Sequence, residues 1–257
     1  TGASGAGGIG ATGASGFTGA TGSGFTGATG IGSVGATGFI GATGSGATGI
    51  GSTGFTGSTG FIGSNLLRIC LRKGFHCTTI SRSQAIIKNP IDGVKYIQAD
   101  IREYEHLRNA IKGASFEYVV NLSGYIEHTP FFDGGEEVIN SHFTGLQNLL
   151  RVLDRENLRR FIQIGSSDEY GNIPAPQKES FREAPISPYS LAKTASTHLL
   201  QMLHHNEQFP AVTLRLFLVY GKGQDDSRFL PQIIKGCIKG KKFPTSMGEQ
   251  LRDFCHV

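Results

Sequence analysis

Short apolar runs alternate with longer amphipathic stretches through most of the chain after residue 57. Strands that alternate with helices favour an α/β fold in which a doubly wound parallel sheet is covered by helices on both faces, as in Rossmann domains. The expected strands are 76–80, 96–99, 118–122, 161–164 and 212–219, and the expected helices are 62–74, 103–112, 136–156 and 188–208.

Glycines at three-residue steps, Gly57, Gly60 and Gly63, open the first of these helices, which Gly74 ends. Glycine permits a tight turn and the close approach of a pyrophosphate to backbone amides at a helix N-terminus. The pattern alone is weak in so glycine-rich a region. The alternation that follows it supports a dinucleotide-binding turn.

The strand that should precede these glycines is poorly marked. Residues 49–56 read GIGSTGFT, where Ile50 and Phe55 are the large apolar side chains. This would be a central strand, buried on both faces. We therefore expect that the strand forms poorly or that the sheet is compromised.

Composition changes sharply near Ser64. Before it there is no charged residue, proline or histidine, and 24 of the 38 glycines lie there. The three-residue glycine step repeatedly falls to two, which excludes a collagen triple helix. Residues 35–41 and 57–63 are near-copies, GATGFIG and GSTGFIG, as in an imperfect duplication. We expect a disordered, low-complexity head at 1–48, a dinucleotide-binding domain at 49–220 and the start of a substrate domain at 221–257.

Charge and cysteine content limit the function classes. A net charge of +4 implies no dedicated nucleic-acid surface, although it suits an anionic ligand. The four cysteines and eight histidines show no metal-ligand spacing, so no metal site is expected. Without an apolar stretch of membrane length or a signal-like start, we expect a cytoplasmic protein with no membrane partner.

Tyr189 and Lys193 are four residues apart in a predicted helix, so both side chains lie on one face. Pro188 suits the first helical turn. A cation beside a phenol favours the phenolate, which would prepare the tyrosine for proton transfer. A half-buried tyrosine with a solvated lysine is the alternative, so other motifs must decide.

Several further motifs occur in a fixed order. They are GSTGFIGS at 57–64, Asp100-Ile101, Asn121-Leu122-Ser123-Gly124, Asn140 with Thr144-Gly145 and Asn148, GSSDEYG at 165–171, Pro188-Tyr189 with Lys193, Leu214-Arg215 to Tyr220-Gly221, and GEQLRDF at 248–254. Together they resemble the extended short-chain dehydrogenase/reductase family, the NAD(P)-dependent epimerases and dehydratases of nucleotide sugars. GSSDEYG and GEQLRDF look most like the 4-keto-6-deoxy-sugar reductases within it.

The resemblance implies a role for each matching residue. Tyr189 would exchange a proton with a sugar oxygen, while Lys193 would bind the nicotinamide ribose and lower the pKa of the tyrosine. Ser166 would hydrogen-bond the reacting oxygen, with Ser167 as the neighbouring candidate. Arg252 would contact the substrate diphosphate, or it is an ordinary surface arginine.

The same resemblance implies a set of cofactor-binding residues, with Tyr189 and Lys193 among them. The others are Gly57, Gly60, Phe61, Ile62, Gly63, Arg82, Asp100, Ile101, Leu122, Ser123 and Gly124. Asp100 could instead cap the next helix, and Asp168 could be a general acid, as in the dehydratases, or a solvated loop carboxylate.

Three departures from the family qualify these expectations. Ser81-Arg82 replaces the acidic residue expected for an NAD ribose, which favours NADP over NAD. Leu218 stands where asparagine is common. The chain stops at Val257, where the family continues, so the substrate domain would be incomplete.

The main functional hypothesis is an NAD(P)-dependent oxidoreductase that reduces a keto group of a nucleotide-diphosphate sugar. The alternatives are an epimerase or dehydratase that retains NAD, and a dinucleotide-binding fragment without turnover. A homodimer is the assembly we consider.

Overall fold

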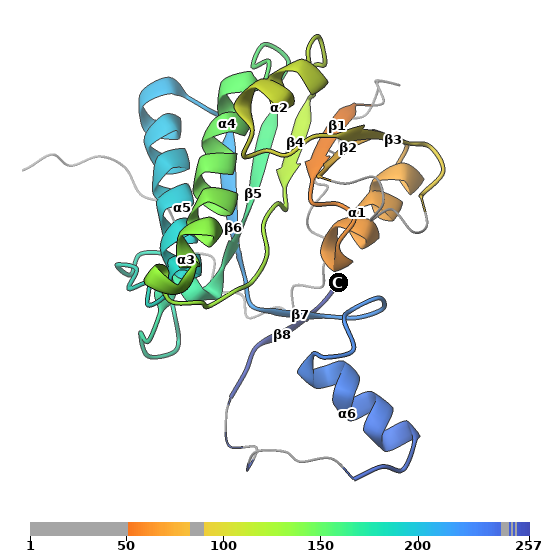
Figure 1. Ribbon diagram of the computed structural model, residues 1–257, viewed down its shortest axis with the longest axis vertical. Coiled ribbons are helices and arrows are strands. Elements are labelled where there is room, and N and C mark those ends of the chain that lie inside the picture. Colours follow the sequence, from red (N-terminus) through yellow and green to blue (C-terminus); the bar gives the residue numbers. More distant parts are fainter. Residues whose placement is uncertain (1–50, 83–89, 243–246, 248, 250) are drawn as a thin grey trace, which may run out of the picture. The chain divides into compact units, whose positions relative to one another are not determined.

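Six parallel strands form the main sheet, in the order β3-β2-β1-β4-β5-β6 (Figure 1). The computed structural model describes residues 51–82, 90–242, 247, 249 and 251–257, so the expected head at 1–48 lies outside the described part. The strands are β1 (Ser52–Thr56), β2 (His76–Ser81), β3 (Val94–Gln98), β4 (Tyr118–Asn121), β5 (Arg160–Ser166) and β6 (Ala211–Leu216). The predicted doubly wound parallel sheet is confirmed.

The helices also follow the predicted periodicity. They are α1 (Phe61–Arg72), α2 (Tyr104–Ala110), α3 (Gly135–Ile139), α4 (Gly145–Val152) and α5 (Pro188–Glu207). A π-helical turn, Asn140–Thr144, joins α3 to α4, so the helix expected at 136–156 has an irregular turn in its middle. It also ends early, because Leu153 has extended backbone angles.

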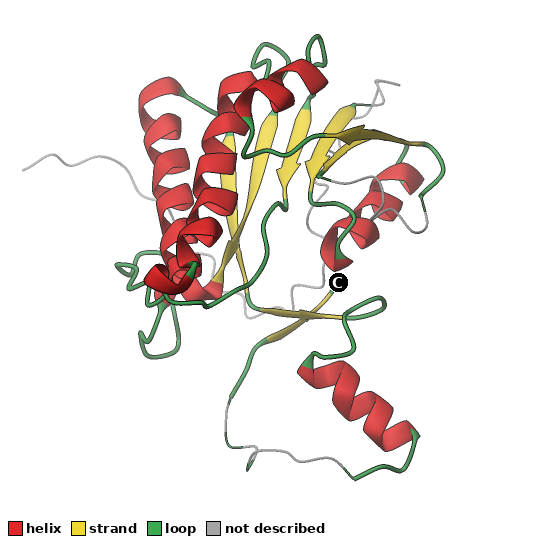
Figure 2. Cartoon of the chain, viewed as in Figure 1, coloured by secondary structure: helices red, strands yellow, loops and turns green. Residues whose placement is uncertain are grey.

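Adjacent residues on one strand enter different cores, because side chains alternate across a sheet. Val119 belongs to a cluster with Leu146 of α4 and Leu200 of α5. Val120 belongs to a second cluster with Leu67 of α1. Helices α4 and α5 therefore cover one face of the sheet and α1 covers the other (Figures 1 and 2).

The last predicted strand, 212–219, is two strands. The chain leaves the main sheet after β6, and β7 (Leu218–Tyr220) pairs in parallel with β8 (Phe254–His256) in a second sheet. Helix α6 (Phe229–Ile238) lies between them in sequence. Both halves of the predicted strand are apolar, so hydrophobicity alone does not mark the break.

Strand β1 is better formed than the sequence suggested. It pairs with β2 on one side and with β4 on the other, and Phe55 is 1% exposed. A Cβ on Gly54 would lie 3.1 Å from the ring of Phe116, so the ring fills the space that a branched side chain would take. The Thr56 hydroxyl donates to Asn121 Oδ1 at 2.5 Å. The prediction of a compromised strand is wrong, because neighbouring side chains supply the bulk that the strand lacks.

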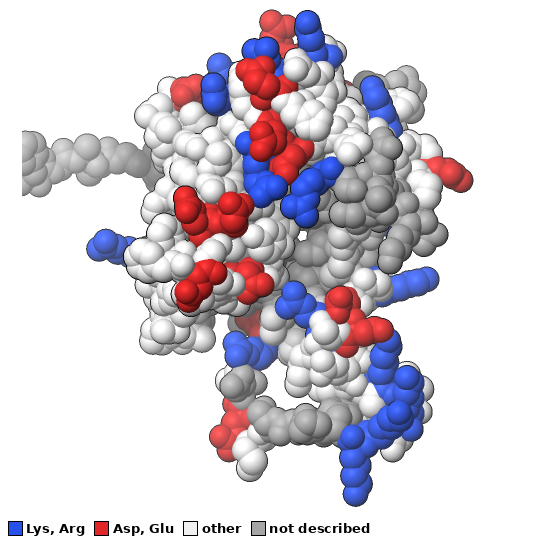
Figure 3. All heavy atoms as spheres, in the orientation of Figure 1, with Lys and Arg blue, Asp and Glu red and all other residues white. Residues whose placement is uncertain are grey.

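Basic side chains gather over α6 and the segment that follows it (Figure 3). Lys235, Lys239, Lys241 and Lys242 occur within residues 235–242. Elsewhere on this face, acidic and basic residues are interspersed. Within the described residues, none of the helices is both long and apolar enough to cross a membrane.

Gly54→Val should destabilise the protein by about 2 kcal/mol, because the new side chain must displace Phe116. Chemical denaturation monitored by circular dichroism measures this. Thr53→Val is the matched control on the same strand. Among the described residues the buried Thr53 hydroxyl lacks a hydrogen-bond partner, so its removal should be neutral or stabilise by about 1 kcal/mol. Stabilisation by Gly54→Val would contradict the packing argument.

Candidate active site

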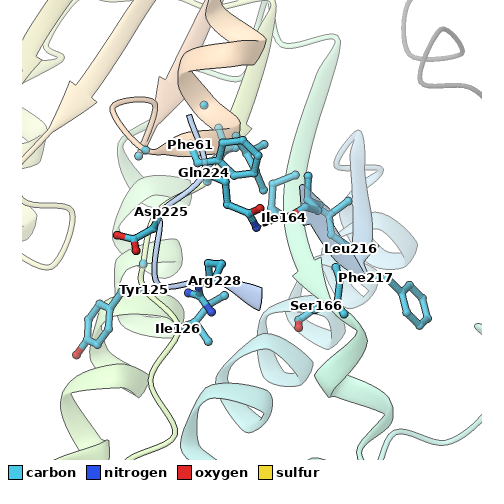
Figure 4. Close-up of a pocket in the computed structure, with 18 of the residues that line it drawn as sticks. Phe61, Tyr125, Ile126, Ile164, Ser166, Leu216, Phe217, Gln224, Asp225 and Arg228 are labelled. Carbon is cyan, nitrogen blue, oxygen red and sulfur yellow. Dashed lines mark hydrogen bonds between the residues drawn. The ribbon is translucent and has the colours of Figure 1, made fainter. Parts of the chain in front are cut away.

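A cavity of about 650 Å³ opens at the carboxyl ends of β1, β4 and β5 (Figure 4). This edge is where parallel α/β sheets bind ligands. Many predicted residues line it: Gly57, Gly60, Phe61, Ile62, Gly63, Leu122, Ser123, Gly124, Ser166, Tyr189 and Lys193. The fold thus brings the proposed catalytic residues and the glycine turn to one cavity.

The glycine turn is packed too tightly for side chains. A Cβ on Gly57 would lie 2.4 Å from the Leu122 carbonyl oxygen, and one on Gly63 would lie 2.3 Å from Ser58 Cα. Gly60 is the N-cap of α1 and no acidic residue occupies the first turn of the helix. The unpaired amides of this helix start therefore border the cavity, which suits an anionic group.

Ser166 and Tyr189 meet at the end of β5. The Ser166 side chain is close enough to the phenol to favour the phenolate. Burial has the larger effect and raises the pKa of Tyr189 above its ordinary value, with Asp168 and Glu169 acting in the same direction. The lowered tyrosine pKa that the sequence predicted is therefore wrong for this arrangement, because desolvation outweighs the favourable contacts.

Lys193 is 4% exposed, and its Nζ donates to the Ile164 carbonyl at 2.7 Å. Burial lowers the pKa of Lys193 to about 8, and the charge of Glu169 opposes this shift. The ammonium lies 5.8 Å from the centre of the Tyr189 ring. Lysine and tyrosine thus share one face of α5, as the spacing predicted.

The start of α5 is fixed by its own sequence. Ser187 is the N-cap: its hydroxyl accepts the Ser190 N–H at 3.1 Å, and Ser190 Oγ accepts the Ser187 N–H at 2.9 Å. Pro188 occupies the first helical turn. This reciprocal cap places Tyr189 at the second helical position and therefore at the mouth of the cavity.

Asp100 and Ile101 lie at the same sheet edge but do not line this cavity. The Asp100 carboxylate pairs with Arg102, which is 2.8 Å away and lowers its pKa. It does not cap α2, whose N-cap is Glu103 without a side-chain bond. Ile101 is buried against Gly145. Arg82 follows β2, close enough to Asp100 to influence its pKa.

Ser167 and Arg252 also lie outside the cavity lining. Ser167 begins a short 3-10 turn after Ser166, and Arg252 is an exposed residue shortly before β8. Their assignment to the substrate stays a prediction.

The structure adds residues that the sequence analysis missed. Arg228, the N-cap of α6, lines the cavity and its charge acts on the Tyr189 phenol (Figure 4). Gln224 lines it as well, and its Oε1 is buried without a hydrogen-bond partner among the described residues. His142, in the π-helical turn, stacks edge-on against Tyr189 at 5.2 Å. Burial lowers its pKa to about 3. The cluster of polar residues after Tyr220 was the available signal for Arg228.

Comparison with known proteins agrees with this geometry. The model of the NAD dependent epimerase/dehydratase family matches residues 55–257. The chain belongs to this family. The predicted resemblance to extended short-chain dehydrogenases/reductases is confirmed.

The curated proteins that the chain resembles include dTDP-glucose 4,6-dehydratases. The dTDP-glucose 4,6-dehydratase of Haemophilus influenzae is 25% identical over 194 residues, which cover 70% of this chain and 57% of that protein. The Escherichia coli enzyme of the same name is 26% identical, over 63% of this chain and 51% of that protein. The chain thus spans about half the length of the curated relatives it matches.

A solved structure gives the same family assignment. UDP-glucuronic acid 4-epimerase from Bacillus cereus, in complex with UDP-glucuronic acid and NAD, is 26% identical with a TM-score of 0.68, and the match covers 80% of this chain and 69% of that one. These relatives are epimerases and dehydratases, which favours that alternative over the main hypothesis of keto-sugar reduction.

Lys193→Met should stabilise the protein at neutral pH, by at most about 3 kcal/mol, because a buried charge is removed. Between about pH 8 and the ordinary lysine pKa of 10.5, the unfolded chain binds more protons than the folded one. Wild-type stability from this lysine therefore rises with pH through that window, and the advantage of the variant shrinks. Denaturation at several pH values measures it. A pH-independent difference would contradict the assignment.

Proposed function

We propose that this chain carries the cofactor-binding part and the proton-transfer residues of an NAD-dependent epimerase or dehydratase of a nucleotide-diphosphate sugar. The observation that carries the proposal is the meeting of Ser166, Tyr189 and Lys193 with the glycine turn in one cavity. The family and the named relatives support the same substrate class.

The residues present fit a dinucleotide. Gly57 and Gly63 allow the tight turn that brings the start of α1 to the cavity, where a pyrophosphate would bind, and Lys193 lines the same cavity. A bound nicotinamide would accept a hydride from a hydroxyl-bearing sugar carbon and return it. As a phenolate, Tyr189 would take the hydroxyl proton and, as the neutral phenol, give it back, while the Ser166 hydroxyl would orient the reacting oxygen. The Lys193 ammonium, 5.8 Å from the Tyr189 ring centre, would supply positive charge nearby.

NAD is the cofactor that the structure of the Bacillus cereus relative favours. The sequence argument for NADP rests on Arg82. The Arg82 charge is close enough to Asp100 to lower the pKa of that carboxyl, so a carboxylate near the arginine would repel a 2′-phosphate. The expected homodimer and cytoplasmic location stay predictions.

Dehydration is the second candidate, because another proton-carrying pair lies beside Tyr189. The His128 ring stands edge-on to the Tyr189 ring at 5.7 Å, and His128 Nε2 lies 3.8 Å from Asp168 Oδ2. Loss of water from a sugar needs a second proton transfer, which Tyr189 alone does not provide. This pair would supply it.

Incubation of the protein with NAD and UDP- or dTDP-sugars separates the possibilities. An epimerase gives a product of unchanged mass, a dehydratase gives a product lighter by one water, and neither consumes NAD. Stoichiometric consumption of NADPH would restore the reductase hypothesis. Cofactor binding without turnover of any sugar would leave a dinucleotide-binding module and contradict the proposal.

Tyr189→Phe should lower turnover by about 10²–10⁴-fold, because the variant lacks the proton-carrying hydroxyl. Cofactor affinity should change little, since the ring remains. Steady-state rates and calorimetric NAD titration measure the two effects. Equal turnover by the variant would remove Tyr189 from the reaction.

Wild-type protein should bind NAD more tightly than NADP. Asp100→Asn should raise NADP affinity by about tenfold, because the offsetting charge near Arg82 is lost. Arg82→Ala is the matched variant and should weaken NADP while leaving NAD unchanged. Calorimetry with both cofactors tests this. If neither variant changes the NADP-to-NAD ratio, these two residues do not face the ribose.

A further inference from the structure

Glu169 carries a carboxylate that is completely buried beside the site. Each of its oxygens has a defined partner. Oε1 accepts the backbone N–H of Ser166 at 2.9 Å, and Oε2 accepts the Thr197 hydroxyl at 2.8 Å and Arg215 Nε at 2.9 Å. Burying a carboxylate is costly unless it is paired and hydrogen-bonded, and this carboxylate accepts three hydrogen bonds, one of them from an arginine.

These contacts fasten α5 to the end of β5. Tyr189, Lys193 and Thr197 follow one another at four-residue steps and so lie on one helix face. Lys193 donates to the Ile164 carbonyl and Thr197 donates to Glu169, while Tyr189 lines the same cavity as Ser166. The two proposed catalytic side chains on α5 thus lie along the same contact between α5 and the end of β5 that Glu169 helps to form.

Lys193 has no ion-pair partner within the described part of the chain, although it is buried. The opposing charge that acts on it is Glu169. Arg215 pairs with the same carboxylate and also with Glu183, and His198 Nε2 lies 3.1 Å from Glu183. Glu169 is therefore ion-paired with Arg215, while its charge acts on Lys193 without an ion pair.

Other charged and titratable groups also face the Tyr189–Lys193 pair. Asp168, from the turn after β5, disfavours the phenolate, and Arg228, ahead of α6, favours it. His142, from the π-helical turn, lies near Lys193, and its own burial keeps it neutral. Asp168 and Arg228 are partly exposed, so solvent screens them more than it screens Glu169.

We propose that Glu169 is a positioning residue: its buried carboxylate ties the Ser166 end of β5 to α5 through Thr197, and its negative charge lies near the Tyr189–Lys193 pair. This inference rests on the proposed function for its catalytic meaning. The effect of Glu169 on the titration of the Tyr189 phenol is measurable without a substrate.

The test is Glu169→Gln, which keeps an acceptor oxygen for the Ser166 N–H and removes the charge. Ultraviolet absorbance of the phenolate is titrated with pH, and the same titration in a Tyr189→Phe background is subtracted to isolate Tyr189. Loss of a nearby negative charge should move the Tyr189 titration to lower pH by about one unit. Thr197→Val is the matched control: it removes a hydrogen bond to the same carboxylate but leaves the charge, so the titration should stay in place.

Glu169→Gln leaves Arg215 buried with one partner fewer and could unfold. The double variant Glu169→Gln/Arg215→Gln then carries the measurement, because it buries neither charge. It should show a smaller shift of the same sign, because loss of the Arg215 positive charge partly offsets loss of the Glu169 negative charge. An unshifted titration in the folded Gln variants, or an equal shift in Thr197→Val, would overturn the inference.

The proposed function is tested separately in the same proteins. Where a sugar substrate turns over, the alkaline limb of the rate profile should move to lower pH together with the phenolate titration in Glu169→Gln. A phenolate shift in a protein that converts no nucleotide sugar would support the counter-charge and contradict the proposed function.

Discussion

A buried ammonium group constrains this site more than any other element in it. Lys193 loses its hydration on α5, and the fold compensates it with a backbone carbonyl at the end of β5 and with the field of Glu169. These contacts require α5, the end of β5 and the turn that carries Glu169 to keep fixed positions relative to one another. The same arrangement brings Tyr189 to Ser166, so the electrostatic requirement and the geometry of proton transfer are met by one set of contacts.

On the other side of the cavity the constraint is space. Gly57 allows the chain after β1 to pack against Leu122 at the end of β4, Gly63 allows α1 to pack against Ser58, and Gly54 leaves room for Phe116. Small residues here do not indicate a weak core. They allow backbone and aromatic groups from neighbouring elements to approach, and this brings the start of α1 to the cavity.

Much of the fold could be predicted because periodicity reports burial. The strands at 76–80 and 118–122 and the helix at 188–208 match β2, β4 and α5 closely. The errors share a physical origin. Residues 49–56 carry few large apolar side chains, yet Phe116 fills the space at Gly54 and the Thr56 hydroxyl is satisfied by Asn121. The break between β6 and β7 lies in continuous apolar sequence, so only sheet pairing reveals it.

The candidate site also contains residues that local patterns predict and residues that they do not. The helical spacing predicts Tyr189 and Lys193, and the three-residue glycine step predicts the glycine turn. The sequence assigned no role to Glu169, because its partners Thr197 and Arg215 are 28 and 46 residues away. The available signal was Arg215, a charge inside an apolar strand, since a buried arginine needs an acid nearby. Burial of ionised groups depends on contacts distant in sequence, which local patterns do not contain.

The strand order of the sheet affects how this protein can fold during its synthesis. β1 pairs with β2 and also with β4, where Thr56 lies opposite Asn121, 65 residues further along the chain. During synthesis from the N-terminus, β1 is made first but acquires its second neighbour only after β2, β3 and α2 have emerged. The Leu122 carbonyl against which Gly57 packs arrives at the same moment. The glycine turn at the cofactor cavity is therefore synthesised well before the residues that fix its conformation. If synthesis pauses before residue 122, this turn remains unstructured.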